Sequence, residues 1–194
     1  MGMIICGLNG SGKSTLGRAL AVHLGWRFID NEDLYFPKED PHYLFAHQRT
    51  QEEVGRLLLE EVQRDDRFVF AAVKGNYGDA VLPYYERAVL VEVPRKLRLQ
   101  RVQQRSLDKF GNRARPGGDL YEREKWFFDH ISARAEDYAE RWLEMVDIPM
   151  LRVDGTRPVE ENIARIVQWL GGCVREELLA GVCEEQCGGG PALL

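Results

Sequence analysis

The residues with the clearest chemical signature form a glycine-rich segment near the start of the chain. Residues 7–14 read Gly-Leu-Asn-Gly-Ser-Gly-Lys-Ser, which fits the pattern G-x-x-x-x-G-K-[ST] without a mismatch. An apolar run precedes this segment and a helical pattern follows it, which is the context in which the pattern forms a phosphate-binding loop. Glycines let the backbone curl so that successive N–H groups point at phosphate oxygens. We expect these residues to bind nucleotide phosphates: Gly7, Asn9, Gly10, Ser11 and Gly12.

Three polar side chains at the end of this phosphate loop (residues 7–14) and just after it should contact the nucleotide: Lys13, Ser14 and Thr15. The Lys13 ammonium should reach the β- and γ-phosphates of ATP, and the Ser14 hydroxyl should ligate Mg²⁺. Thr15 should lie near the α-phosphate. The alternative, a glycine-rich turn that only joins a strand to a helix, is disfavoured by the full match in the right context.

A second candidate site is the acidic segment that follows an apolar run at 26–29. Asp30, Glu32 and Asp33 should lie at the carboxyl end of a strand, where open α/β sheets bind ligands. Phosphoryl transfer to a hydroxyl needs a group that accepts its proton, and oxygen ligands for Mg²⁺. We expect Asp30 and Glu32 to be catalytic, Asp30 also to ligate Mg²⁺ with Ser14, and Asp33 to contact the acceptor. Which carboxylate is the base stays open, and the alternative is that these acids cap a helix.

A third candidate site is basic. The predicted helix from Arg95 to Leu107 holds five cations and no carboxylate. Like charges at helical spacing cost roughly 0.2–0.5 kcal/mol per pair, so we expect an anionic group to face them. Arg98, Arg101 and Arg105 fall on one face of this helix. The alternative is a solvated face paired with acids of other helices.

These elements alternate in the way that is typical of an α/β protein. The pattern predicts strands at 3–6, 26–29, 68–73, 88–93 and 150–153. It predicts helices at 13–24, from Thr50 onward with Glu53 completing a capping box, from Pro94 to about 107, from 119 to about 145, and after Pro158. Residues 1–170 should form one domain, and residues 171–194 a C-terminal appendage.

The chain resembles the small P-loop kinases, namely shikimate kinase, gluconate kinase and the nucleoside monophosphate kinases, over roughly residues 3–170. The resemblance implies a three-layer P-loop NTPase fold with a five-stranded parallel sheet in the order 2-3-1-4-5. It also implies a helical lid at about 107–120, whose arginines stabilise charge on the transferred group. By this resemblance Arg105 and Arg115 are catalytic, Arg113 binds nucleotide and Arg101 binds substrate, although Arg98 stands where the related pattern has leucine.

Other motifs of these kinases match in part. Asp30 and Glu32 fall on the Asp-x-Asp pattern of shikimate and gluconate kinases, while the glycine of the nucleoside monophosphate kinases' Gly-Asp is missing before Asp33. Lys74 matches a segment of gluconate kinases and should bind substrate, with a solvated turn lysine as the alternative. Arg157 lies in a loop that wraps the adenine ring in such enzymes. The run 68–73 ends without the Walker B acid of GTPases and motors, which disfavours those classes.

Composition limits the remaining possibilities. The chain of 194 residues carries a net charge of −5, so general nucleic-acid binding is disfavoured. Its apolar runs are too short to cross a membrane, and its four cysteines without a secretion signal favour a reducing, cytoplasmic location. The oligomeric state is not indicated.

The sequence therefore predicts an ATP-dependent kinase, with ATP and Mg²⁺ as cofactors, that moves the γ-phosphoryl group to the hydroxyl of a small metabolite. Two alternatives stay open. One is a nucleoside monophosphate kinase, and the other is a regulatory ATP-binding or ATPase module without a small-molecule acceptor.

Overall fold

A computed structural model describes residues 1–36 and 48–171 of the chain. The appendage predicted for 171–194 therefore lies outside the described residues, except for Gly171. One five-stranded parallel sheet organises the rest, and its order β2-β3-β1-β4-β5 confirms the predicted order. The strands are β1 (Gly2–Cys6), β2 (Arg27–Asp30), β3 (Phe68–Ala72), β4 (Arg87–Glu92) and β5 (Met150–Asp154).

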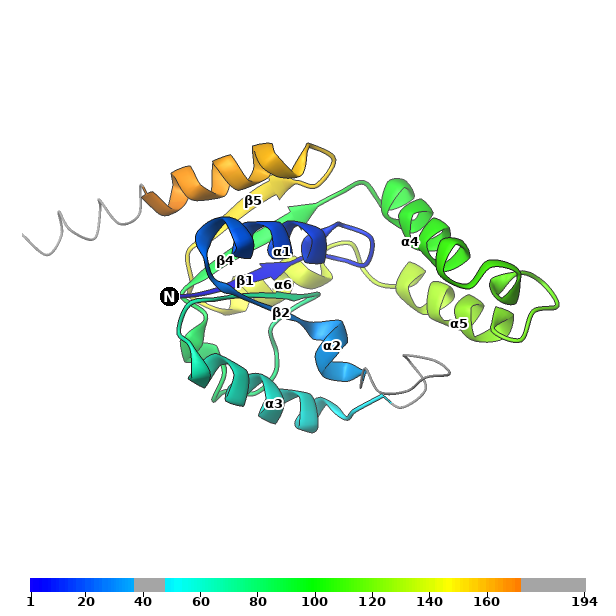
Figure 1. Ribbon diagram of the computed structural model, residues 1–194, viewed down its shortest axis with the longest axis horizontal. Coiled ribbons are helices and arrows are strands. Elements are labelled where there is room, and N and C mark those ends of the chain that lie inside the picture. Colours follow the sequence, from blue (N-terminus) through cyan, green and yellow to red (C-terminus); the bar gives the residue numbers. More distant parts are fainter. Residues whose placement is uncertain (37–47, 172–194) are drawn as a thin grey trace, which may run out of the picture.

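The central strands are buried on both faces, which explains their continuous apolar sequence. Alternate residues of β1 divide between two cores: Ile4 and Cys6 point to one, Met3 and Ile5 to the other. Helices α3 (Gln51–Arg64) and α6 (Tyr138–Met145) cover the first core, whereas α1 (Lys13–Leu24) and the final helix (residues 159–171) cover the second. The molecule thus has three layers, with the sheet in the middle (Figure 1).

Helix α3 begins where its sequence predicts. The Thr50 hydroxyl accepts a hydrogen bond from the Glu53 N–H at 3.2 Å, and the Glu53 carboxylate accepts one from the Thr50 N–H at 2.7 Å. This reciprocal pair is the expected capping box, and removing such a cap costs about 0.5–2 kcal/mol of stability. The first turn of α3 is thus fixed by local sequence.

A helical hairpin projects from the sheet beyond the carboxyl ends of the strands (Figure 1). It consists of α4 (Arg95–Phe110), a short 3₁₀ helix η2 (Gly111–Ala114) and α5 (Tyr121–Ser132). The Ser106 hydroxyl donates to the Glu124 carboxylate at 2.7 Å and so joins the two long helices. Arg113 and Asp119 form a bidentate ion pair across the tip. The segment predicted as a lid, 107–120, is the tip of this hairpin.

One predicted element is wrong. The spacing of apolar residues predicts a single helix from 119 to about 145, but the chain forms α5 and then α6, with residues 133–137 outside helix. In a continuous helix the Ser132 carbonyl would accept a hydrogen bond from the N–H of Glu136. It accepts one from the Arg95 guanidinium at 2.5 Å instead, while the Glu136 carboxylate turns toward α4. Tertiary contacts therefore interrupt a sequence that contains no local helix breaker.

Candidate active site

The phosphate loop joins β1 to α1 at the carboxyl edge of the sheet. Gly10 and Gly12 have φ angles of +82° and +90°, a conformation that side chains disfavour. A Cβ atom on Gly10 would also lie 2.3 Å from the carbonyl oxygen of Arg98 in α4. The hydroxyl of Ser11 is buried and lacks a hydrogen-bond partner within the described part of the chain. An orphaned donor inside a loop of this type fits a site that phosphate oxygens complete.

Lys13 begins α1 and carries the strongest electrostatic signature of the site. Burial lowers the pKa of its ammonium from 10.5 to about 8. Asp30 and Glu32 oppose this by raising the pKa, whereas Arg105 lowers it further. The charge of Lys13 in α1 is therefore influenced by side chains from the end of β2, from α2 and from α4.

The acidic segment occupies the end of β2 and the short helix α2 (Asn31–Tyr35). The Asp30 carboxylate caps this helix, because its Oδ1 accepts a hydrogen bond from the Glu32 N–H at 3.0 Å. The capping alternative is thus realised for Asp30, and the charge of the same carboxylate raises the pKa of Lys13. Glu32 and Asp33 lie in the first turn of α2 and are exposed.

Two cations meet on one tyrosine at the opposite wall of the site. The Lys74 ammonium, just past β3, lies 4.4 Å from the ring centroid of Tyr138. The Arg134 guanidinium lies 5.2 Å from the centroid of the same ring. Behind them the Tyr77 hydroxyl donates a 2.5 Å hydrogen bond to the Asn31 amide oxygen, which joins the β3 side to α2. This wall supplies positive charge beside the carboxylates.

Arg134 is a site residue that the sequence left without a definite role. It lies in the interruption between α5 and α6, and its Nη1 donates to the Asn9 amide oxygen of the phosphate loop at 2.9 Å. Its Nη2 is 3.3 Å from His130 Nε2. The signal that could have found it is small: His130 and Arg134 are four residues apart and share one face of the predicted helix.

The other predicted arginines lie along α4, the hairpin tip and the loop after β5. Arg101 Nη1 lies 3.5 Å from the Gly10 carbonyl oxygen and 3.2 Å from that of Gly155, so it bridges the phosphate loop and the β5 loop. Arg157 pairs with Glu161 at 3.3 Å. Arg105 and Arg115 form no ion pair with any residue in the ranges 1–36 and 48–171, so their charges are available to a ligand.

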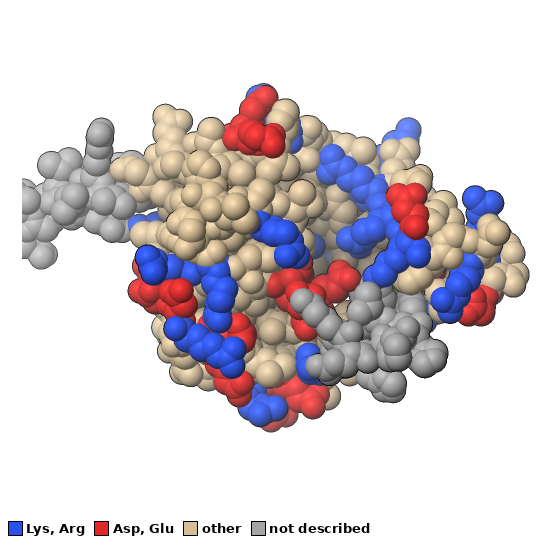
Figure 2. Space-filling view, viewed as in Figure 1, with Lys and Arg blue, Asp and Glu red and all other residues tan. Residues whose placement is uncertain are grey.

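Two hollows lie along α4, one at its first turns and one along its second half. The first, about 530 Å³, lies beside the phosphate loop and is lined by apolar side chains, by Arg98 and by the carboxylates of Glu92, Glu136, Asp137, Glu140 and Asp154. Three of these acids are paired with arginines, Glu136 with Arg98 and both Glu92 and Glu140 with Arg152. The second, an open basin of about 490 Å³, is lined by Arg101, Gln104, Arg105, Asp108 and Lys109. Figure 2 shows basic side chains gathered where α4 and α5 leave the core, facing acidic side chains near the centre of the same face. The basic side therefore suits phosphate binding.

The donor set also fits a magnesium nucleotide. Mg²⁺ is usually held by one or two carboxylates, a hydroxyl and substrate phosphates, with waters completing its shell. Ser14 and Asp30 are the residues that could hold it. Within the described ranges there is no cluster of three His, Cys, Asp or Glu side chains suited to a metal.

The chain has a P-loop fold with the architecture of the small P-loop kinases. Shikimate kinase from Aquifex aeolicus vf5 is 18% identical, with a TM-score of 0.54 over 90% of this chain and 98% of that one. Deoxyadenosine kinase from M. mycoides, solved with bound dATP, is 15% identical, with a TM-score of 0.53 over 88% of this chain and all (100%) of that one. At these identities the likeness concerns the fold.

The chain is also similar in sequence to the uncharacterized protein YqaC of Bacillus subtilis (strain 168). The two are 26% identical over 174 residues, which cover 86% of this chain and 95% of that protein. No protein-family profile matches the chain. Among the described residues, no helix is long and apolar enough to span a bilayer.

Proposed function

We propose that the protein is an ATP-dependent small-molecule kinase that transfers the γ-phosphoryl group of ATP to a hydroxyl of a metabolite. The observation that carries this proposal is that two carboxylates accompany the complete phosphate loop, Asp30 at the end of β2 and Glu32 in the first turn of α2, and that their charges act on the Lys13 ammonium. A site that only holds a magnesium nucleotide needs the lysine and a carboxylate for Mg²⁺. A site that transfers a phosphoryl group to a hydroxyl also needs a base, which the second carboxylate can supply.

Each side chain has a role in this proposal. Lys13 binds the β- and γ-phosphates, Thr15 lies near the α-phosphate, and Mg²⁺ held through Ser14 and Asp30 neutralises phosphate charge. Asp30 or Glu32 accepts the proton of the attacking hydroxyl. The remaining cations divide between the nucleotide (Arg101, Arg113 and Arg157), the transferred group (Arg105 and Arg115) and the acceptor (Lys74 and Arg134), with Asp33 also on the acceptor side.

Arg101 receives a different role here from the acceptor contact that the resemblance implies. Its guanidinium lies against the carbonyls of Gly10 and Gly155, which flank the expected nucleotide site. The acceptor side of the site is instead marked by Lys74 and Arg134, which share the Tyr138 ring. Two cations on one wall favour an acceptor that carries an anionic group beside its reacting hydroxyl.

The test is a transfer screen with ATP labelled on its γ-phosphate. Purified protein is incubated with sugars, sugar acids, cyclic hydroxy acids, nucleosides and nucleoside monophosphates, and labelled products are separated from free phosphate. A labelled acceptor that requires Asp30 or Glu32 supports the kinase. Labelled nucleoside diphosphate supports the nucleoside monophosphate kinase instead. Slow release of phosphate with every compound supports the regulatory module.

The lid belongs to the same proposal. We infer that residues 107–120 close over bound nucleotide and bring Arg115 to the transferred group, because closure excludes water and strengthens each contact. Amide hydrogen exchange across 107–120 is measured with and without a non-hydrolysable ATP analogue. Protection that appears only with the analogue supports closure, and equal exchange in both states at saturation removes the lid.

A further inference from the structure

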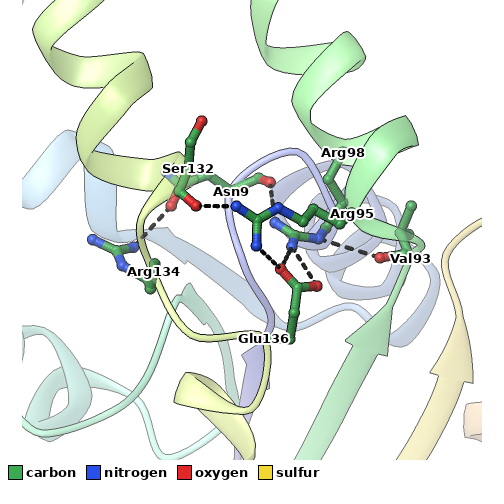
Figure 3. Close-up of polar contacts among 7 residues, drawn as sticks. All are labelled: Asn9, Val93, Arg95, Arg98, Ser132, Arg134 and Glu136. Atoms are coloured by element: carbon green, nitrogen blue, oxygen red, sulfur yellow. Dashed lines mark hydrogen bonds and ion pairs between the residues drawn. The ribbon is translucent and has the colours of Figure 1, made fainter.

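A buried arginine lies at the root of the helical hairpin, at the position where the related kinase pattern has leucine. The side chain of Arg98 is 5% exposed. Its Nε donates to the Val93 carbonyl at 3.2 Å, and its Nη1 donates to the Asn9 carbonyl at 3.3 Å. Its Nη2 contacts both carboxylate oxygens of Glu136 at 2.8 Å (Figure 3). This arginine is therefore satisfied within the chain and is not one of the cations that await a ligand.

The contact with Asn9 bears directly on phosphate binding. The peptide bond between Asn9 and Gly10 is trans, so the Asn9 carbonyl and the Gly10 N–H point in opposite directions. Since the carbonyl points at Arg98, the Gly10 N–H points away from α4. Backbone N–H groups of a phosphate loop act only when they point at the phosphates. Arg98 thus holds one peptide unit of the loop in a defined orientation.

Glu136 extends this hold to the other side of Asn9. It lies in the interruption between α5 and α6, pairs with Arg98, and lies 3.6 Å from Arg95. Two residues before it, Arg134 donates to the Asn9 amide oxygen at 2.9 Å. Asn9 is therefore held by its carbonyl from α4 and by its side chain from the α5–α6 connection. Figure 3 shows the arginines converging on the two acceptors, Asn9 and Glu136.

We propose that Arg98 and Glu136 form a positioning pair that sets the tip of the phosphate loop and holds Arg134 beside it. The pair fixes the Asn9–Gly10 peptide for phosphate binding, and it fixes the α5–α6 connection from which Arg134 reaches the loop. The first effect requires only that the loop binds nucleotide. The second effect, on turnover, rests on the kinase function proposed above.

The decisive variant combines Arg98→Leu with Glu136→Leu. Replacing both partners of a buried ion pair by apolar side chains is often neutral or stabilising, so this double variant separates positioning from stability. Affinity for a non-hydrolysable ATP analogue, measured by calorimetry at fixed Mg²⁺, should fall about tenfold. The thermal midpoint without ligand should stay the same or rise. A purely structural role predicts the opposite pattern, with a lower midpoint and an unchanged affinity.

A milder variant keeps the test valid if the double variant fails to fold. Glu136 is half-exposed, so Glu136→Gln should fold, and it should weaken analogue binding about three- to fivefold. The ¹⁵N–¹H resonance of Gly10 should shift in this variant, because its peptide unit loses a fixed orientation. The matched control is Lys125→Gln, which removes the exposed Lys125–Asp129 pair of the same hairpin and should change neither quantity.

The outcomes separate this proposal from the kinase assignment, because analogue binding needs no acceptor. If affinity falls while no acceptor is ever phosphorylated, the positioning pair stands and the kinase does not. If an acceptor is phosphorylated but both variants bind the analogue within twofold of the unaltered protein, the positioning pair is overturned and the kinase stands.

Discussion

The phosphate loop and the α5–α6 connection meet at Asn9, but their conformations have different origins. The loop owes its shape to residues within it, since Gly10 and Gly12 adopt φ angles that side chains disfavour. The connection contains ordinary helix-forming residues and is interrupted by contacts with α4. The glycine conformations of the loop need no outside contact, whereas the orientation of its Asn9–Gly10 peptide and the course of the connection both depend on partners in other elements. The site thus combines an autonomous half with a dependent half.

The largest expected effect comes from the autonomous half. Lys13→Ala should abolish turnover, because in the proposed mechanism it removes the charge that contacts the β- and γ-phosphates. The fold should persist, since burial already disfavours the Lys13 charge in the folded protein. Steady-state kinetics measures the loss of turnover, and circular dichroism measures whether the fold persists. Retained turnover with an unchanged spectrum would contradict the site as drawn.

The carboxylates test whether the site transfers a group or only holds one. Asp30→Asn and Glu32→Gln are compared, and the variant that removes the base should lower kcat about 10²- to 10⁴-fold with little change in ATP affinity. Asparagine also caps helices well, so Asp30→Asn preserves the start of α2. Changes in kcat below about threefold in both variants would leave these acids as structural groups.

The affinity for an ATP analogue, measured as a function of pH, tests the charge of Lys13 in the phosphate loop. Its pKa of about 8 in the free protein should rise when a triphosphate binds, because negative charge favours the ammonium. Below pH 8 the lysine is charged in both states and affinity should be flat. Above pH 8 binding must take up a proton, so affinity for the ATP analogue should fall, by up to about tenfold per pH unit. The groups that face the ammonium are Asp30, Glu32, Arg105 and Cys6.

The matched control for this profile is Lys13→Arg, because a guanidinium stays charged across the whole range. Its affinity should be lower but independent of pH. If the unaltered protein shows a flat profile up to pH 10, then Lys13 does not deprotonate in the free protein.

The smallest effect on kcat is expected from a change at the α5–α6 connection, the part of the site that depends on tertiary contacts. Arg95→Ala removes the donor to the Ser132 carbonyl and the second cation beside Glu136, so helix should extend into residues 133–137. Backbone chemical shifts of 133–137 report this directly, and kcat should fall a few-fold as Arg134 leaves Asn9. Coil-like shifts that match the unaltered protein would show that the interruption does not depend on Arg95.

Much of the fold follows from the sequence because its signals are local. Continuous apolar runs mark buried parallel strands, the glycine pattern marks the phosphate loop, and Thr50 with Glu53 marks the start of α3. The strand order came instead from the resemblance to small P-loop kinases, and the structure confirms it. Asp30 and Lys13 are predicted to share one site because each follows a strand, and parallel strands bring their carboxyl ends to one edge of the sheet. The resemblance to small P-loop kinases places them in the same way.

Tertiary structure alone decided where α5 and α6 separate and which acid pairs with Arg98. Periodicity predicts one helix from 119 to 145, since residues 133–137 contain neither glycine nor proline to end it. Arg98 looked like a cation awaiting an anionic ligand, but it is buried against Glu136, 38 residues away. Which acid meets a buried arginine depends on how two helices pack, and no spacing in the sequence records that. Sequence therefore determined where the phosphate loop lies, whereas packing decided how the loop is held and that Arg134 lies beside it.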